Sequence, residues 1–289
     1  MAVVKATAPP PAPPAEGEEA PTRPPLAARI GLRVASPVLS FVESFGEHMI
    51  LLGRTTAWLF RRPFRPKLFL EQMEFVGVGS LPIIMLVGFF SGVVAALQAV
   101  LALRMFQQER WVGFGVGISL ARELAPVFSA LMITARAGSA MATELGSMRI
   151  TEQIDALTTF AVNPIQYLVT PRVVASILML PVMTIIFNVV GLVGAYMVAI
   201  VFYNVDFGQA AELYRFYTDP TDYLQGMIKA VVFGLSMALT ACYQGFNVRG
   251  GAKEVGRATT RAVVASSVSV LVLDYPLIQI FTVIWPFGE

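Results

Sequence analysis

Five charged side chains interrupt the apolar stretches of this sequence, and they are the residues best placed to do chemistry. They are Arg122, Glu123, Lys229, Arg257 and Asp274. A charge at the middle of a bilayer costs on the order of 3 kcal/mol, so each must face an opposite charge or a water-filled cavity. One interpretation is a substrate cavity whose cations lie near a phosphate or another anionic group. The other is a set of internal ion pairs, such as Asp274 with Lys229 or Arg257, that only hold helices together.

The Arg122–Glu123 pair favours the cavity, because two adjacent opposite charges lie in an otherwise apolar helix. Catalytic motifs are missing from the sequence: it has no G-x-x-x-x-G-K-[ST] nucleotide-binding motif and no G-x-S-x-G. His48 is the sole histidine and Cys242 the sole cysteine, which excludes an internal disulfide and a multi-cysteine metal site. Asp274 has no second aspartate in a facing span, as an intramembrane protease would need. We therefore expect a protein that is not an enzyme.

The composition indicates a membrane protein. Hydrophobic residues make up 56% of the chain and charged residues 14%, and the mean hydropathy is +0.67. A soluble domain carries about 25% charged residues, so this chain has too little polar surface to cover a water-facing globule. The net charge of +2 gives no indication of a nucleic-acid partner. The predicted fold class is an all-α integral membrane protein.

Five apolar stretches are long enough to cross a bilayer, which takes about 20 residues. The predicted spans are residues 79–103, 112–142, 173–203, 223–246 and 262–287. They form a five-span domain over residues 68–289. Residues 26–67 are expected to be an interfacial amphipathic helix followed by a basic linker, and residues 1–25 a disordered Pro-rich tail. Lys and Arg are concentrated before span one and after spans two and four, which predicts a cytoplasmic N-terminus and an external C-terminus.

The segment after the second span is the most distinctive part of the chain. Within the span, Gly138 and Ala142 lie one helical turn apart, which lets two helices approach closely, either within the chain or between two copies. Residues 144–160 then become charged, with Ile150, Ile154 and Leu157 at helical spacing beside acidic side chains. This pattern suits insertion into a groove on a partner protein; the alternative is a solvated loop helix.

Three stretches of the sequence resemble the MlaE (YrbE) permease family. They are RELAPVFSALMITARAGSAMATELGSMRITEQIDAL, AVNPIQYLVTPR and GRATTRAVVASSVSVLVLDY, and the resemblance extends from about Leu26 to the C-terminus. Members of this family are permease subunits of ABC transporters that move phospholipids or related lipids between the inner and outer bacterial membranes. The resemblance implies a homodimer in the inner membrane, an ABC ATPase subunit below and a periplasmic MCE-domain protein above. It implies no cofactor in this chain, since ATP and Mg would be bound by the partner ATPase.

The resemblance also assigns roles to residues. The implied lipid pocket at the dimer interface comprises Gln98, Ala102, Leu103, Phe106, Arg122, Glu123 and Leu124. The implied buried charges are Lys229, Arg257 and Asp274, and the implied coupling helix carries Thr151, Glu152, Gln153, Asp155 and Leu157. Phe106 stands where relatives carry a tyrosine, so a hydrogen bond to a head group is not expected there. The rival function is a non-transporting membrane scaffold or channel subunit, although a channel should show a continuous polar path rather than isolated charges.

Overall fold

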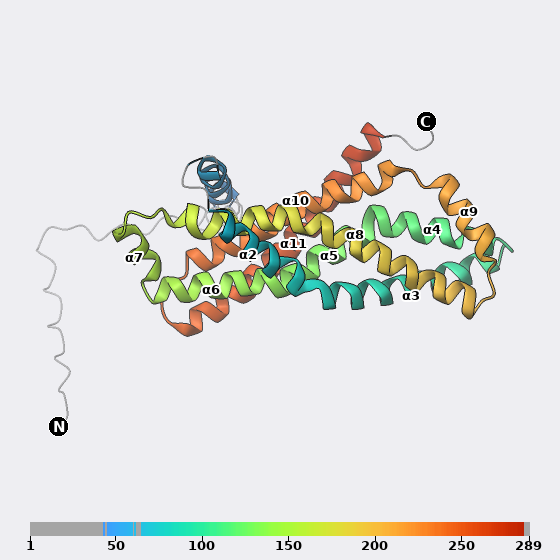
Figure 1. The fold of residues 1–289 in the computed structure, drawn as a ribbon, viewed down its shortest axis with the longest axis horizontal. Helices are drawn as coiled ribbons and strands as arrows, with labels where there is room; N and C mark the ends of the chain where they lie inside the picture. The colour runs from blue at the N-terminus through green and yellow to red at the C-terminus, as the bar shows by residue number, and fades with distance from the viewer. Residues whose placement is uncertain (1–42, 44, 60, 62–64, 286–289) are drawn as a thin grey trace, which may run out of the picture. The chain divides into compact units, whose positions relative to one another are not determined.

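The structure is a computed structural model that describes residues 43, 45–59, 61 and 65–285. The chain divides into two compact units, Met1–Glu47 and His48–Glu289, and every labelled helix belongs to the second (Figure 1). The Pro-rich tail predicted for residues 1–25 lies outside the described residues, as does much of the predicted interfacial helix. Of that helix, the structure describes a helical segment at residues 45–59.

The described part of the second unit is built from helices alone. Besides residues 48–59, the α-helices are α2 (Pro66–Val76), α3 (Leu81–Arg104), α4 (Val112–Ser119), α5 (Ala125–Ile133), α6 (Ser139–Ile150), α7 (Gln153–Thr159), α8 (Thr170–Val201), α9 (Phe207–Tyr217), α10 (Pro220–Phe246) and α11 (Ala252–Ile284). Five helical stretches in the described residues are long and apolar enough to cross a membrane: Pro66–Arg104, Glu109–Ile150, Ile165–Val201, Pro220–Phe246 and Ala252–Ile284. The predicted all-α membrane fold with five spans is confirmed.

The last span begins earlier than predicted. The sequence placed a loop over residues 247–261, whereas α11 starts at Ala252. Lys253, Arg257 and Arg261 are exposed, so the first turns of α11 carry their charges on an open face of the helix. A charged start is compatible with a helix that extends beyond the apolar part of a span, and for this reason hydropathy alone placed the boundary too late.

Three π-helical segments interrupt the spans. They are Leu120–Leu124 between α4 and α5, Thr134–Gly138 between α5 and α6, and Ile165–Val169 before α8. A π-helical turn changes the direction of the side chains around it and is frequent at functional sites. Arg122 lies at the centre of the first segment and Arg136 at the centre of the second, so both arginines are placed by an irregular turn.

Close helix contacts in this bundle depend on glycine. A Cβ atom on Gly92 of α3 would collide with the backbone of Gly191 in α8, and one on Gly194 would lie 2.5 Å from the carbonyl oxygen of Phe89. On the other side, a Cβ on Gly245 of α10 would lie 2.7 Å from the carbonyl oxygen of Ala142 in α6. The stripe of small residues around Ala142 is therefore used for packing within the chain, as small residues allow in membrane helices.

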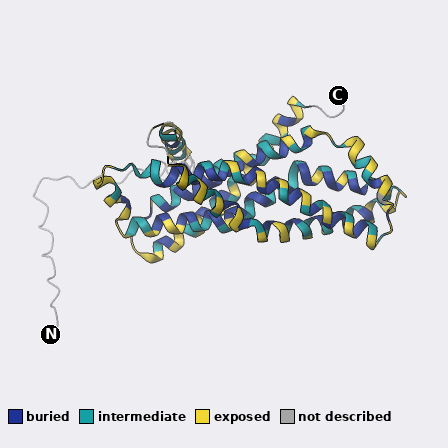
Figure 2. Cartoon of the chain, viewed as in Figure 1, coloured by how far each residue is buried: buried dark blue, intermediate teal, exposed yellow. Residues whose placement is uncertain are grey.

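Burial differs sharply between neighbouring spans. In the most apolar window of α10, 61% of the residues are buried, whereas in α11 the figure is 11%. Figure 2 shows buried residues along the inner faces of the long helices and exposed residues along the outer ones. Large apolar side chains of α3, of the turn after it and of α11 are among the exposed ones, including Leu101, Phe106, Leu271 and Val272. These faces are suited to contact lipid or another protein rather than water.

Candidate functional site

Lys229 is the centre of a charge network inside the bundle. Its side chain is only 1% exposed, and Nζ lies 2.5 Å from Oε2 of Glu123 and 3.0 Å from Oδ1 of Asp274. The three residues come from the first π-helical segment, α10 and α11. The predicted internal pair of Lys229 with Asp274 is confirmed, and Glu123 joins it. A buried ammonium group held by two carboxylates is an arrangement that offsets the cost of burial.

Arg122 and Glu123 are adjacent in sequence but have different partners. Arg122 pairs with Asp222 of α10, and its Nε donates a hydrogen bond of 2.6 Å to Oδ1. Asp222 is 1% exposed and also accepts a 3.0 Å hydrogen bond from the backbone N–H of Asp219, which closes a capping box at the start of α10. Sequence reasoning placed Asp222 in a polar loop and missed this role. The signal was the D-P-T-D sequence, which has capping-box spacing.

A cavity of about 220 Å³ opens beside this network. Its lining combines the polar side chains of Ser119, Arg122, Glu123, Gln225, Lys229 and Thr282 with the apolar side chains of Ile118, Ile278 and Phe281 and with Trp285. Glu123 is 40% exposed and Arg122 18% exposed at the side chain, so both can reach a ligand while keeping their partners. A lining of charged and apolar side chains suits a molecule with a charged head and a hydrocarbon body.

The residues assigned to the lipid pocket fall into two groups. Arg122 and Glu123 line this cavity, while Leu124 is half-buried and packs against the core. Gln98, Ala102 and Phe106 are exposed near the end of α3, and Leu103 is half-buried there. These α3 residues do not line the cavity beside Arg122 within one chain. Their assignment to a lipid site remains a prediction.

For two arginines, the burial and the partner of the side chain differ from what the sequence indicated. Arg257 is 61% exposed at the side chain and pairs with Glu254 one turn earlier in α11, at 2.6 Å. Its position in the extended, charged start of α11 explains the error. Arg172, which lies between the second and third predicted spans, is 3% exposed and pairs with Glu144 at 2.7 Å, which ties the first turn of α8 to α6.

Arg136 was missed among the charges within the spans. Its guanidinium donates to the carbonyl oxygen of Phe75 at 2.6 Å and to Oγ of Ser80 at 3.1 Å, and it lies over the Phe75 ring. A Cβ on Gly79 would collide with this guanidinium. Arg136 therefore connects the second π-helical segment to the junction of α2 and α3. A single arginine in a run of small residues was the available signal.

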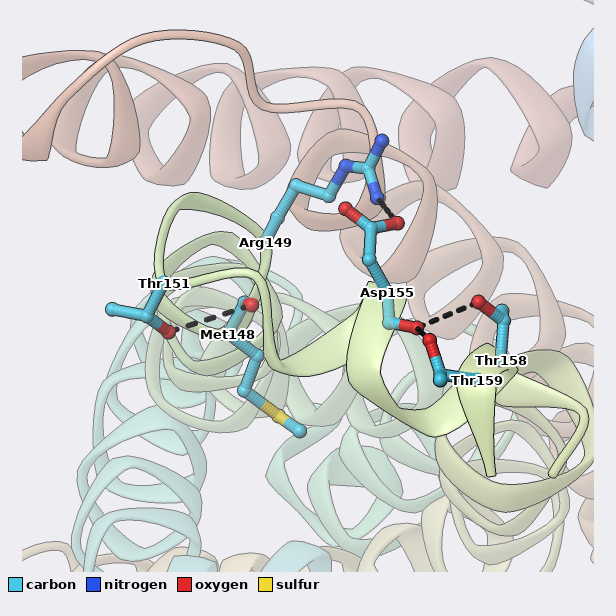
Figure 3. Close-up of polar contacts among 6 residues, drawn as sticks. All are labelled: Met148, Arg149, Thr151, Asp155, Thr158 and Thr159. Atoms are coloured by element: carbon cyan, nitrogen blue, oxygen red, sulfur yellow. Dashed lines mark hydrogen bonds and ion pairs between the residues drawn. The ribbon is translucent and has the colours of Figure 1, made fainter. Parts of the chain in front are cut away.

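A short helix, α7, forms where the resemblance implies a coupling helix, and Figure 3 shows polar contacts in and around it. Glu152 precedes it with a φ of 60°, so the chain turns sharply before the helix begins. Arg149 and Asp155 form an ion pair of 2.6 Å, and the hydroxyls of Thr158 and Thr159 donate to the carbonyl oxygen of Asp155. These short-range bonds hold a helix of only 7 residues in place.

The apolar face of α7 is used within the chain. Ile154 is 2% exposed and packs with Leu145 and Leu168, and Leu157 is partly buried against the same cluster. The expectation that these apolar side chains insert into a partner was therefore wrong for Ile154. The exposed residues include Thr151, Glu152, Gln153 and Asp155, and Phe160 follows the helix with 78% of its surface exposed. Any partner of α7 would meet a mainly polar surface with one aromatic ring at its end.

A family model described as Permease MlaE matches residues 69–280 of the chain. The chain belongs to the MlaE permease family. The matched residues include part or all of each of the five spans, Arg122 and Arg136 of the first two π-helical segments, and α7. The MlaE chain is therefore a multi-pass membrane permease of the ABC transporter kind.

Several relatives agree with this assignment. A probable ABC transporter permease protein of Rickettsia conorii is 39% identical over 250 residues, which is 86% of this chain and 96% of the relative. The intermembrane phospholipid transport system permease protein MlaE of Haemophilus influenzae is 35% identical over 257 residues, covering 84% of this chain and 98% of that protein. The chloroplastic protein TRIGALACTOSYLDIACYLGLYCEROL 1 of Arabidopsis thaliana is 35% identical over 73% of this chain and 61% of its own length.

Proposed function

We propose that this MlaE chain moves phospholipids between the inner and outer membranes of a bacterium, as one half of a homodimeric permease. A partner ATPase would bind ATP and Mg and drive the movement, and a periplasmic MCE-domain protein would receive or supply the lipid. The Haemophilus relative, named as an intermembrane phospholipid transport permease, supports the substrate class. The observation in this chain that carries the proposal is the cavity lined by both charged and apolar side chains.

The charges around this cavity favour a zwitterionic head group. Arg122 and Lys229 are the cations, and Glu123, Asp222 and Asp274 are the carboxylates, so the network holds one more carboxylate than cations. Asp222 and Asp274 are the more buried carboxylates and hold the cations in place, whereas Glu123 is 40% exposed. Arg122 would bind the lipid phosphate and Glu123 the amine of a group such as ethanolamine.

The exposed end of α3 would complete the site in the dimer. Gln98, Ala102 and Phe106 are exposed in one chain, and the partner copy would cover them. Acyl chains would lie against Leu103 and Phe106, each buried methylene contributing about 0.8 kcal/mol. The charges would orient the lipid, while most of the affinity would come from burying its chains.

Coupling to the ATPase would pass through α7. Its exposed surface carries Glu152 and Asp155, and the Arg172–Glu144 pair joins the two helices that flank it. A push on α7 would move α6 and α8 together, and α6 continues from the π-helical segments that hold Arg122 and Arg136. The positive-inside asymmetry of the sequence supports an orientation with α7 and the N-terminus in the cytoplasm and the C-terminus in the periplasm.

The lipid site is tested by mass spectrometry of lipids retained by the purified complex. Phe106→Glu should abolish lipid retention, because it places a charge where acyl chains would lie, and Leu103→Glu should do the same. Phe202→Glu is the matched control, since Phe106 and Phe202 are both exposed phenylalanines just after a long helix, at 74% and 68%. Full lipid retention by Phe106→Glu with a folded dimer would contradict the pocket assignment.

The coupling assignment is tested by recovery of the ATPase with the affinity-tagged permease. Glu152→Lys and Asp155→Lys should abolish recovery, because they invert the charge of the exposed α7 surface. Glu212→Lys inverts an exposed charge on α9 and should leave recovery unchanged. Equal ATPase recovery from all three variants would contradict the role of α7.

A further inference from the structure

A second cavity, of about 260 Å³, lies where the helix of residues 48–59 is followed by α2. Its lining residues are Trp58, Leu59, Arg61, Arg65, Leu68, Phe69, Ala161, Val162, Asn163, Gln166, Tyr167, Thr170 and Pro171. None of them lines the cavity beside Lys229. Two sequence segments about 100 residues apart meet here, and Gln166 Nε2 joins them by donating a 2.8 Å hydrogen bond to the carbonyl oxygen of Arg61.

Both arginines of this cavity are held by aromatic rings. The guanidinium carbon of Arg61 lies 4.8 Å from the ring centroid of Trp58, and that of Arg65 lies 5.2 Å from that of Tyr167. Cation–π contacts orient a guanidinium while leaving its N–H groups available for hydrogen bonds. The third π-helical segment carries Gln166 and Tyr167, two adjacent residues that both line the cavity.

The cavity has cations but no counterion among its described residues. No aspartate or glutamate lines it, and neither Arg61 nor Arg65 forms an ion pair with a residue that the structure describes. The remaining polar lining consists of Asn163, Gln166, Tyr167 and Thr170, with Leu59, Leu68 and Phe69 as apolar walls. Two guanidinium groups with spare donors are suited to a phosphate, which accepts several N–H bonds at once.

From this geometry we infer that the cavity binds the phosphate of an anionic lipid from the adjacent leaflet, at a site separate from the transport site. A lipid is favoured over a free anion because the walls are apolar and Trp58 is of the type that anchors helices at the membrane interface. Basic pockets between helices on the cytoplasmic side of membrane proteins bind such head groups. The ligand class is an anionic phospholipid, for which phosphatidylglycerol is the probe.

The site adjoins the C-terminal end of the coupling helix. Ala161 and Val162 follow Phe160, the residue after α7, and Ala161 has a φ of 57°, a conformation that is uncommon for residues with a side chain. Asn163 then accepts a 2.9 Å hydrogen bond from the backbone N–H of Ile165, which starts the next helical segment. A lipid bound here would connect the segment before α2 with the turn after α7, and would thereby stiffen the coupling helix.

The test measures binding of phosphatidylglycerol and phosphatidylcholine to the purified permease by native mass spectrometry. The unmodified chain should bind phosphatidylglycerol preferentially. Arg61→Gln combined with Arg65→Gln should weaken phosphatidylglycerol binding by about thirtyfold, since each cation near an anionic lipid contributes on the order of 1 kcal/mol. Arg249→Gln combined with Lys253→Gln removes two exposed cations, one from the loop before α11 and one from its first turn, and is the matched control, with no loss expected.

A second pair of variants isolates the charge at one position. Gln166→Glu and Gln166→Met both remove the donor to Arg61, but only the first places a carboxylate in the cavity. Gln166→Glu should lose phosphatidylglycerol binding and Gln166→Met should retain it. This comparison holds even if the double arginine variant fails to fold.

Several outcomes would overturn the inference. The first is equal binding of the two lipids by the unmodified chain. The second is an equal loss of phosphatidylglycerol binding in the arginine variant and in its control. The third is displacement of phosphatidylglycerol by millimolar inorganic phosphate, which would indicate a free-anion site. The experiment tests this site separately from the proposed transport site. Phe106→Glu should leave phosphatidylglycerol binding beside Tyr167 intact, and the arginine variant should still retain lipid beside Arg122.

Discussion

The two cavities of this permease use charge in opposite ways. Beside Lys229, each of the cations that lines the cavity is paired with a carboxylate from another helix, and the carboxylates outnumber the cations. In the cavity beside Tyr167, the lining arginines lie over aromatic rings and have no carboxylate among the described residues. We conclude that the charges around Lys229 stabilise the fold through their ion pairs. The two arginines beside Tyr167 remain available to bind a ligand.

Lys229→Met should have the largest effect on stability. It leaves Glu123 and Asp274 without their shared cation, and removing one partner of a buried pair costs about 3–5 kcal/mol. The expected value is near the lower limit, because Glu123 is 40% exposed. The measurement is the free energy of unfolding in detergent micelles. A loss below about 1 kcal/mol would show that the network does not hold α10 and α11 together.

Gly226→Ala should have the next largest effect, because it separates α10 from the segment that holds Arg122. A Cβ atom there would collide with the backbone carbonyl of Ala121, and overpacking of this kind costs about 1–3 kcal/mol. Gly115→Ala is the matched control, since a Cβ on Gly115 of α4 meets nothing within 4 Å. It should be neutral or stabilising by up to about 1 kcal/mol. Equal melting temperatures for the two variants would remove the close-contact explanation.

Tyr167→Leu tests the weaker contacts of the second cavity. It removes the ring beneath Arg65 but keeps an apolar side chain, so the loss of stability should be about 0.5–1 kcal/mol, the value of an exposed cation–π contact. Trp58→Leu should behave alike through Arg61. The free energy of unfolding of both variants is measured in the same micelles. If it falls by as much as in Lys229→Met, the two cavities do not differ in how much their charges stabilise the fold.

Arg61→Gln combined with Arg65→Gln removes the charge from both cation–π contacts but keeps both rings and a side chain beside each, so the loss of stability should stay below the summed losses of Tyr167→Leu and Trp58→Leu. Its effect should appear in lipid binding instead. Unfolding in micelles without anionic lipid gives the stability, and repetition with phosphatidylglycerol should stabilise only the unmodified chain. A large loss in lipid-free micelles would mean that the arginines serve the fold.

Much of the architecture follows from sequence alone. Five apolar stretches and the near absence of charge within them predict the spans, because a bilayer admits little else. The energetic cost of a charge in a bilayer also identified Arg122, Glu123, Lys229 and Asp274. The same argument failed for Arg257, because hydropathy does not show where a helix leaves the apolar region, and α11 starts 10 residues before its predicted span.

The sequence did not show which residues each charged or apolar side chain contacts. Arg122 and Glu123 looked like one ion pair, yet adjacent residues of a helix point in different directions, and each found a separate partner in α10. Arg172 looked like a loop cation and is buried against Glu144. The apolar positions of α7 suggested a partner groove, but Ile154 is covered by the chain itself. In each case the decisive contact joins residues on different elements.

The sequence by itself determined that this protein crosses the membrane, that its few intramembrane charges need partners, and that it shares the motifs of the MlaE permeases. These properties depend on local composition and on the low dielectric of the bilayer, which act on each segment separately. Only the tertiary structure decided which carboxylate meets which cation, and that the two arginines of the cavity beside Tyr167 have no carboxylate partner among the described residues. Such pairings depend on helix register, glycine contacts and π-helical turns, which arise when the segments pack together.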